Sequence, residues 1–146
     1  MSTQMAVDAD TIVSSIYAGN AMVENGIIPK GVWGFNKDLT RSAYDPEGAK
    51  ALLADAGYAD GEISFELSMD SSASSNHQVV QQNLQAIGIN AGIKSYDESS
   101  WLDLRKSGEM DSFIATWTMD YNDPANIMYT FFGSAAKTRI RSLNYS

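Results

Sequence analysis

Apolar positions along the chain follow helical and strand-like periods that alternate from about residue 45 onward. Between Asp45 and Gly57, apolar residues recur at the spacing of a helix face, with Asp45 placed to cap the helix. The stretch ISFELSM, residues 63–69, alternates as a half-covered strand does. A second helix is expected from a capping box at Ser75 to a stop at Gly88. The predicted buried positions in these elements are Ala49, Leu52, Leu53, Ala56, Ile63, Phe65, Leu67, Met69, Val80, Leu84 and Ile87.

Weaker patterns complete a set of alternating helices and strands. They predict a helix over 10–17, strands over 89–95 and 111–117, a helix over 99–107, and a helix starting at Asp123-Pro124. Residues 111–117 are apolar on both faces, which favours a central strand covered on both sides. The order predicts an α/β fold class, with helices packed on a mostly parallel (mixed) sheet. The 146 residues fit one α/β domain.

Charge and composition exclude several function classes. Ten basic residues against eighteen acidic ones give a net charge of −8, which argues against a nucleic-acid partner. The absence of cysteine excludes disulfides, thiolate catalysis and thiolate metal sites. No stretch of 18 apolar residues is present to span a membrane.

The segment FIATWTMDYNDPANIMYTFFG, residues 113–133, holds the most suggestive chemistry. Asp120 follows the predicted central strand, and ligands of α/β sheets gather at the carboxyl ends of strands. Trp117 and Tyr121 flank it, and aromatic walls beside an unpaired carboxylate suit an ammonium-bearing ligand. An Asx-turn is the structural alternative for Asp120. Asp123 precedes Pro124 and is explained by capping of the last helix.

Other reactive groups give weaker patterns. The only histidine, His77, is expected as an exposed residue of a first helical turn, and no G-x-S-x-G elbow surrounds any serine. DYNDPA has alanine where an EF-hand loop needs glycine, so no metal site is predicted. A carboxylate-based hydrolase that pairs Asp120 with Asp123 or Glu98 stays open as an alternative function.

Several segments together resemble one known family. They are MAVDADTIVSSIYAGNAMVENGIIPKGVWGF, DPEGAKALLADAGYADGEISFELSM, LQAIGINAGIKS and SGEMDSFIATWTMDYNDPANIMYTFF. In this order they resemble the oligopeptide- and dipeptide-binding proteins of ABC importers, the family 5 extracytoplasmic solute-binding proteins. The resemblance runs from about Met5 to Ser146, nearly the whole chain.

The resemblance implies a ligand site around Asp120. In that family the aspartate of the W-x-x-D-Y-N-x-P segment binds the α-ammonium group of the peptide, and here that position is Asp120. The neighbouring Trp117, Thr118 and Met119 are expected to pair with the peptide backbone like an added strand, beside Tyr121.

Two residues of the 99–107 helix region extend the expected site. Arg105 aligns with an arginine that some members use for the peptide carboxylate, although by itself it is typical of an exposed helix residue. Glu98 stands where several members have a tryptophan that lines a side-chain pocket, and Trp101 falls on a buried helix position. A less aromatic and more acidic pocket is therefore expected.

The resemblance also implies partners and a location. The chain is expected to be most of one lobe of a type II periplasmic binding protein, without its partner lobe and export signal. The parent protein would work in the periplasm or at the cell surface, capturing peptides or related solutes and delivering them to an ABC permease. Neither catalysis nor a cofactor is implied. The alternative is a truncated or remodelled lobe that acts as an interaction domain without transport.

Overall fold

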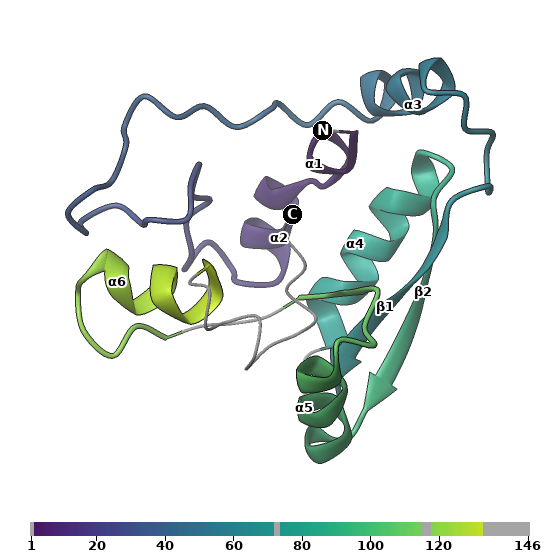
Figure 1. Cartoon of the computed structure of the whole chain (residues 1–146). Coiled ribbons are helices and arrows are strands. Elements are labelled where there is room, and N and C mark those ends of the chain that lie inside the picture. Colours follow the sequence, from purple (N-terminus) through teal and green to yellow (C-terminus); the bar gives the residue numbers. More distant parts are fainter. Residues whose placement is uncertain (1, 72–73, 115–117, 133–146) are drawn as a thin grey trace.

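A computed structural model describes residues 2–71, 74–114 and 118–132 of the chain (Figure 1). In these parts helices pack on a parallel sheet, as the order of elements predicted. None of the helices there is long and apolar enough to cross a membrane. The elements are α1 (Ser2–Ala6), α2 (Ala9–Ser15), α3 (Pro46–Asp55), β1 (Ser64–Asp70), α4 (Ser74–Ala86), β2 (Asn90–Tyr96), α5 (Glu98–Ser107), β3 (Ser112–Phe113), α6 (Pro124–Ile127) and the π-helical turn η1 (Met128–Phe132).

The sheet has the order β2-β1-β3, and both strand pairs are parallel. The prediction of a central strand over 111–117 is wrong for its described part, because β3 lies at an edge and β1 at the centre. The apolar character of β3 has another source: Phe113 packs edge-on against Trp101 of α5, with ring centroids 6.0 Å apart. The pattern of a covered strand belongs instead to β1, where three consecutive residues, Leu67, Ser68 and Met69, are buried.

One face of the sheet carries the hydrophobic core. In Figure 1, α4 lies along β1 and β2, and α1 and α3 close the end of this layer. Ala6 of α1 and Ala49 of α3 are fully buried at the contact of these two helices. No helix was predicted at the N-terminus, since five residues are too few to show a helical period. The buried core residues are Ala6, Ala49, Leu84, Ile87, Ile89 and Ala91, with Met5, Leu53, Ile63, Phe65 and Val80 packed against them.

Helix α3 is capped as predicted, but its buried face is narrower. Asp45 accepts the backbone N–H of Gly48 at 2.8 Å, and Pro46 occupies the first turn. Leu52, with 41% of its surface exposed, and the exposed Ala56 were predicted to be buried. Ala49 and Leu53, four residues apart, lie on the side of α3 that meets the core. Leu52 and Ala56 lie on the adjacent side, which is exposed to solvent.

His77 corrects a second prediction, because only 1% of its surface is exposed. Helix α4 begins at Ser74, one residue before the predicted cap at Ser75. His77 lies three residues before Val80 and seven residues before Leu84. This helical spacing places it on the face of α4 that packs on the sheet. The imidazole is part of the interior and not an exposed group of the first turn.

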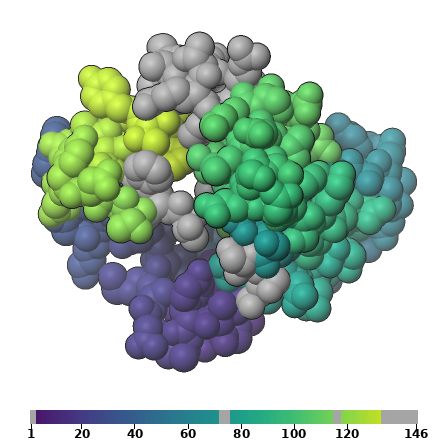
Figure 2. All heavy atoms as spheres, turned by 90° about the horizontal axis from the view of Figure 1, so that it is seen from below, coloured from purple at the N-terminus to yellow at the C-terminus, as the bar shows by residue number. Residues whose placement is uncertain are grey.

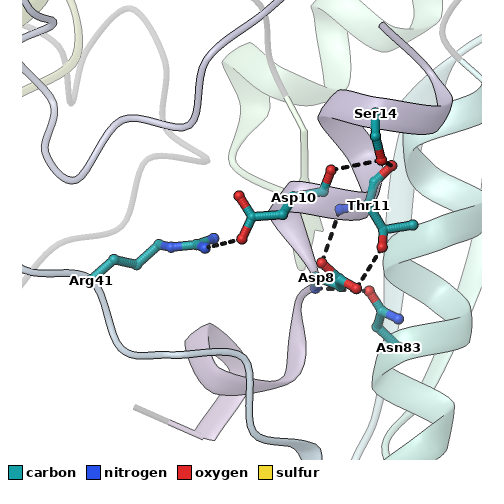
Figure 3. Close-up of polar contacts among 6 residues, drawn as sticks. All are labelled: Asp8, Asp10, Thr11, Ser14, Arg41 and Asn83. Atoms are coloured by element: carbon teal, nitrogen blue, oxygen red, sulfur yellow. Dashed lines mark hydrogen bonds and ion pairs between the residues drawn. The ribbon is translucent and has the colours of Figure 1, made fainter. Parts of the chain in front are cut away.

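The start of α2 is tied to α4 by a small polar cluster (Figure 3). Asp8 caps α2, accepting from the backbone N–H of Thr11 at 2.9 Å and from its hydroxyl at 2.6 Å. The backbone N–H of Asp8 donates to Asn83 Oδ1 at 3.1 Å, and Arg41 pairs with Asp10 at 3.1 Å. The bond to Asn83 holds the start of α2 against α4. The ion pair holds Arg41, in the connection between α2 and α3, against α2.

Candidate functional site

The carboxyl ends of the strands lead into the segments that carry the expected ligand residues. Because β1, β2 and β3 are parallel, their carboxyl ends share one edge of the sheet. The chain leaves β2 into Asp97 and Glu98, and after β3 it continues through 118–123 into α6. This edge is where open α/β sheets bind ligands.

Asp97 organises the start of α5. Its carboxylate accepts the backbone N–H of Ser100 at 3.0 Å and the hydroxyls of Ser99 and Ser100, each at 2.6 Å. These bonds, the Ser100 hydroxyl first, hold the pKa of Asp97 well below its usual range. Glu98 follows in the first helical turn with its side chain exposed. Glu98 therefore lies exposed at the carboxyl edge of the sheet.

Asp120 is exposed, and among the described residues one hydrogen bond is made to its side chain. Its Oδ2 accepts the side-chain amide of Asn126 at 3.4 Å. Asn126 is 5% exposed, and its backbone N–H donates to the Asp123 carbonyl at 3.0 Å. Within the described part of the chain no Lys, Arg or His pairs with Asp120. The carboxylate is therefore oriented by a buried amide while keeping its charge available to a cation.

The neighbours of Asp120 in the chain present a mixed surface. Tyr121 is 56% exposed, Thr118 is exposed and Met119 is half-buried. Trp117, the other predicted aromatic wall, lies outside the described residues. Of the predicted group, the structure thus places 118–121 together at one exposed turn.

Asp123 has the predicted capping role and a second role that was not predicted. Its Oδ1 accepts the backbone N–H of Ala125 at 2.7 Å at the start of α6. Its Oδ2 accepts the indole N–H of Trp33 at 3.2 Å. Next to it, the Asn122 amide donates to the Gly31 carbonyl at 3.4 Å. The connection between α2 and α3, which showed no periodic pattern, thus forms one side of the Asp120 segment.

Arg105, in the last turn of α5, is more enclosed than its sequence context indicated. Its guanidinium lies 4.8 Å from the ring centroid of Trp101, which is 8% exposed as predicted. Burial lowers the pKa of Arg105, and its Nε has no hydrogen-bond partner. No carboxylate pairs with it among the described residues. Within the described residues the guanidinium is therefore a cation without an anionic partner.

The structure does not bring all the predicted residues together. The described residues include no hydrogen bond or ion pair that joins Asp120 to Glu98 or Arg105. Seven residues along α5 separate Glu98 from Arg105 by about 10 Å of helix. Both helices are visible on the face shown in Figure 2, α5 in green and α6 in yellow-green. Where the chain is described, no three acidic or histidine side chains gather into a possible metal site.

A polar cluster on the sheet was not anticipated from the sequence. Glu66 Oε1 accepts the Tyr96 hydroxyl at 2.6 Å and the Ser68 hydroxyl at 2.9 Å, and Lys94 approaches Oε2 at 3.4 Å. The Tyr96 hydroxyl is the main cause that lowers the pKa of Glu66. A groove of about 470 Å³ adjoins it, lined in part by Phe65, Asn90 and Gly92. The cluster satisfies its own hydrogen bonds, which gives it a structural role.

Comparison with known proteins matches this architecture to solute-binding proteins. The family model of bacterial extracellular solute-binding proteins, family 5, matches residues 3–139. The dipeptide-binding protein of Escherichia coli K12 is 32% identical over 147 aligned residues, which cover 97% of this chain and 27% of that protein. The heme-binding protein A of Haemophilus influenzae is 29% identical over 136 residues, covering 89% of this chain and 25% of that protein.

A solved structure shows the same fold. The periplasmic binding protein of an ABC transporter from Helicobacter pylori, in complex with the peptide STSA, superposes with a TM-score of 0.88 at 28% identity. The match covers 97% of this chain and 28% of that one. The chain thus spans little more than a quarter of the length of these relatives. It belongs to the bacterial extracellular solute-binding proteins of family 5.

Proposed function

We propose that the chain is one ligand-binding lobe of a substrate-binding protein that captures peptides, or closely related small solutes, for an ABC importer. The observation that carries the proposal is Asp120, an exposed carboxylate that is oriented by the buried Asn126 and pairs with no cation among the described residues. Such a group suits the α-ammonium of a peptide, because a charge-assisted hydrogen bond is the strong kind. Relatives named for dipeptide and di/tripeptide binding support the same ligand class.

The remaining predicted residues have roles in this proposal. The backbone of Trp117, Thr118 and Met119 would pair with the extended peptide, which gives affinity without reading side chains. Tyr121 would border the ammonium site. Arg105 would take the peptide carboxylate, as a half-enclosed cation without an anionic partner.

Glu98 would act on side-chain preference. It is exposed at the carboxyl edge of the sheet, next to the capping residue Asp97. A carboxylate there would favour ligands that present a basic side chain and disfavour acidic ones. The proposed pocket is therefore more acidic than one lined by tryptophan.

The proposal includes a second lobe, an ABC permease and a place outside the cytoplasmic membrane. Several large apolar side chains are exposed, among them Trp33 and Tyr129, and an exposed apolar surface is typical of a binding interface. A second lobe closing over the ligand would cover part of this surface. Capture by closure needs no chemical step, in line with relatives that are named for binding alone.

Heme is the second candidate ligand, because one relative is a heme-binding protein. Heme carries two propionates, so its capture would depend on cations such as Arg105. The net charge of −8 and the open carboxylates of Asp120 and Glu98 favour a ligand that brings a positive charge.

Calorimetric titration of the full-length protein that carries these residues tests the proposal. The ligands are the tripeptide Ala-Ala-Ala, its N-acetylated form and hemin. We expect saturable binding of the free tripeptide and at least tenfold weaker binding of the acetylated one, since acetylation removes the ammonium. Tight binding of hemin with no binding of either peptide would replace the peptide assignment by heme.

A further inference from the structure

Two segments that are ninety residues apart in the sequence are joined beside Asp120. Residues 31–34 belong to the connection between α2 and α3, and residues 122–124 lead into α6. The indole N–H of Trp33 donates to Asp123 Oδ2 at 3.2 Å, and the Asn122 amide donates to the Gly31 carbonyl at 3.4 Å. Pro124 Cγ lies 3.9 Å from the position that a Cβ on Gly34 would take.

Hydrogen bonds through Asp123 and Asn126 connect this junction to the carboxylate of Asp120. Asp123 receives the Trp33 indole on one oxygen and caps α6 with the other, at 2.7 Å from Ala125 N. The Asp123 carbonyl accepts the backbone N–H of Asn126 at 3.0 Å. The buried side chain of Asn126 then donates to Asp120 Oδ2 at 3.4 Å. A shift of Asp123 would therefore move Asn126, whose side-chain amide orients Asp120.

Burial does not explain why Trp33 is held there. A tryptophan normally hides most of its large apolar surface, yet Trp33 remains 70% exposed. Its hydrogen bond in the described structure is the one to Asp123, which joins its connection to the segment that carries Asp120. The indole thus contributes a directed donor more than it contributes to the core.

We propose that Trp33 is a positioning residue for peptide binding: its indole N–H fixes Asp123, and through Asn126 fixes the Asp120 carboxylate. The inference rests on the proposed function, in which Asp120 binds the ligand ammonium. Affinity from a charge-assisted bond depends on a carboxylate that is already placed, because ordering it on binding would cost free energy. Trp33 adds this order from outside the site and touches no ligand atom in this role.

Trp33→Phe is a selective test, because it removes the donor and keeps an aromatic ring at an exposed position. In the full-length protein we expect about three- to tenfold weaker binding of Ala-Ala-Ala, the range of one lost hydrogen bond. Binding of N-acetyl-Ala-Ala-Ala should be unchanged, since it has no ammonium for Asp120. In an Asp120→Asn background Trp33→Phe should have no further effect, which a double-mutant cycle measures.

Two further variants complete the test. Asp123→Ser keeps a helix-capping hydroxyl but removes the carboxylate that receives the indole, and it should reproduce the loss seen with Trp33→Phe. Tyr17→Phe is the matched control, because it removes one exposed aromatic hydroxyl, which accepts from Asn76 at 2.8 Å away from this junction. Tyr17→Phe should leave the affinity for both ligands unchanged.

The outcomes separate this inference from the proposed function. If Asp120→Asn weakens binding and Trp33→Phe does not, the positioning role is wrong while the function stands. Equal weakening of both ligands by Trp33→Phe, or full additivity with Asp120→Asn, also overturns the positioning role. If Asp120→Asn itself leaves the affinity unchanged, the ammonium site of the proposed function fails.

Discussion

The side-chain amide of Asn126 lies 3.4 Å from Asp120 Oδ2, so a buried group with 5% exposure orients an exposed carboxylate. Replacing Asn126 by alanine should therefore affect both stability and the site. We expect a loss of about 1–2 kcal/mol in the free energy of unfolding, because a buried side chain and its hydrogen bond to Asp120 are removed. Urea denaturation measures it. Asn25→Ala is the control, since Asn25 is exposed and donates to the Leu39 carbonyl at 3.1 Å; a similar loss there would remove the special role of Asn126.

Glu66 makes the stability depend on pH in a defined direction. Its pKa is lowered, chiefly by the Tyr96 hydroxyl, so folding favours the charged form. The stabilisation is complete above the ordinary glutamate pKa, about 4.3, and is lost as the pH falls through the lower folded value. Unfolding of wild type and Glu66→Gln, followed by urea titration at several pH values, should show a difference that shrinks toward acid. A Glu66→Gln difference that stays constant with pH would contradict the account.

Gly88 ends α4 in a conformation that other residues adopt with strain. Its φ is +84°, and a Cβ there would meet Asp60 Cα at 3.1 Å. We expect Gly88→Ala to cost about 1–2 kcal/mol, from the left-handed backbone alone. Gly92→Ala is the matched control, because Gly92 has no atom within 4 Å of the added methyl. Thermal unfolding should separate the two variants, and equal midpoints would show that the turn tolerates a side chain.

Arg105 gives a prediction about the other end of the ligand. If its guanidinium takes the peptide carboxylate, Arg105→Met should weaken binding of a free tripeptide about tenfold, the scale of a charged hydrogen bond. Binding of the same peptide with a C-terminal amide should change little. Lys106→Met is the control, since Lys106 is the exposed neighbour of the same helix turn. Equal effects on both peptides would place Arg105 outside the carboxylate site.

The sequence correctly predicted helix ends that depend only on residues close together in the chain. Asp45, Asp123 and Gly88 were expected to bound helices, and the structure shows two caps and a left-handed glycine at these positions. Each signal involves residues within one helical turn, so no tertiary contact is needed to recognise it. The burial of Trp101 followed from the helical period in the same way.

The errors concern contacts between distant segments. His77 was predicted to be exposed because it opens a helix, but the sheet covers that face of α4. The order of strands places β3 at an edge, which the apolar character of its residues could not show. The bond between Trp33 and Asp123 spans ninety residues and has no periodic signature. The residues around Asp120 were predicted from their place after a strand and from their likeness to a family, whereas the contacts that hold them are seen only in the structure.

The central claim is that Asp120 binds the ammonium group of a peptide, and one comparison tests it most directly. The dissociation constants of Ala-Ala-Ala and N-acetyl-Ala-Ala-Ala are measured for wild type and Asp120→Asn in the full-length protein. We predict that Asp120→Asn weakens binding of the free peptide at least tenfold and leaves the acetylated peptide unaffected, so that the two ligands become nearly equivalent. An unchanged preference for the free peptide in Asp120→Asn would contradict the account and place the ammonium elsewhere.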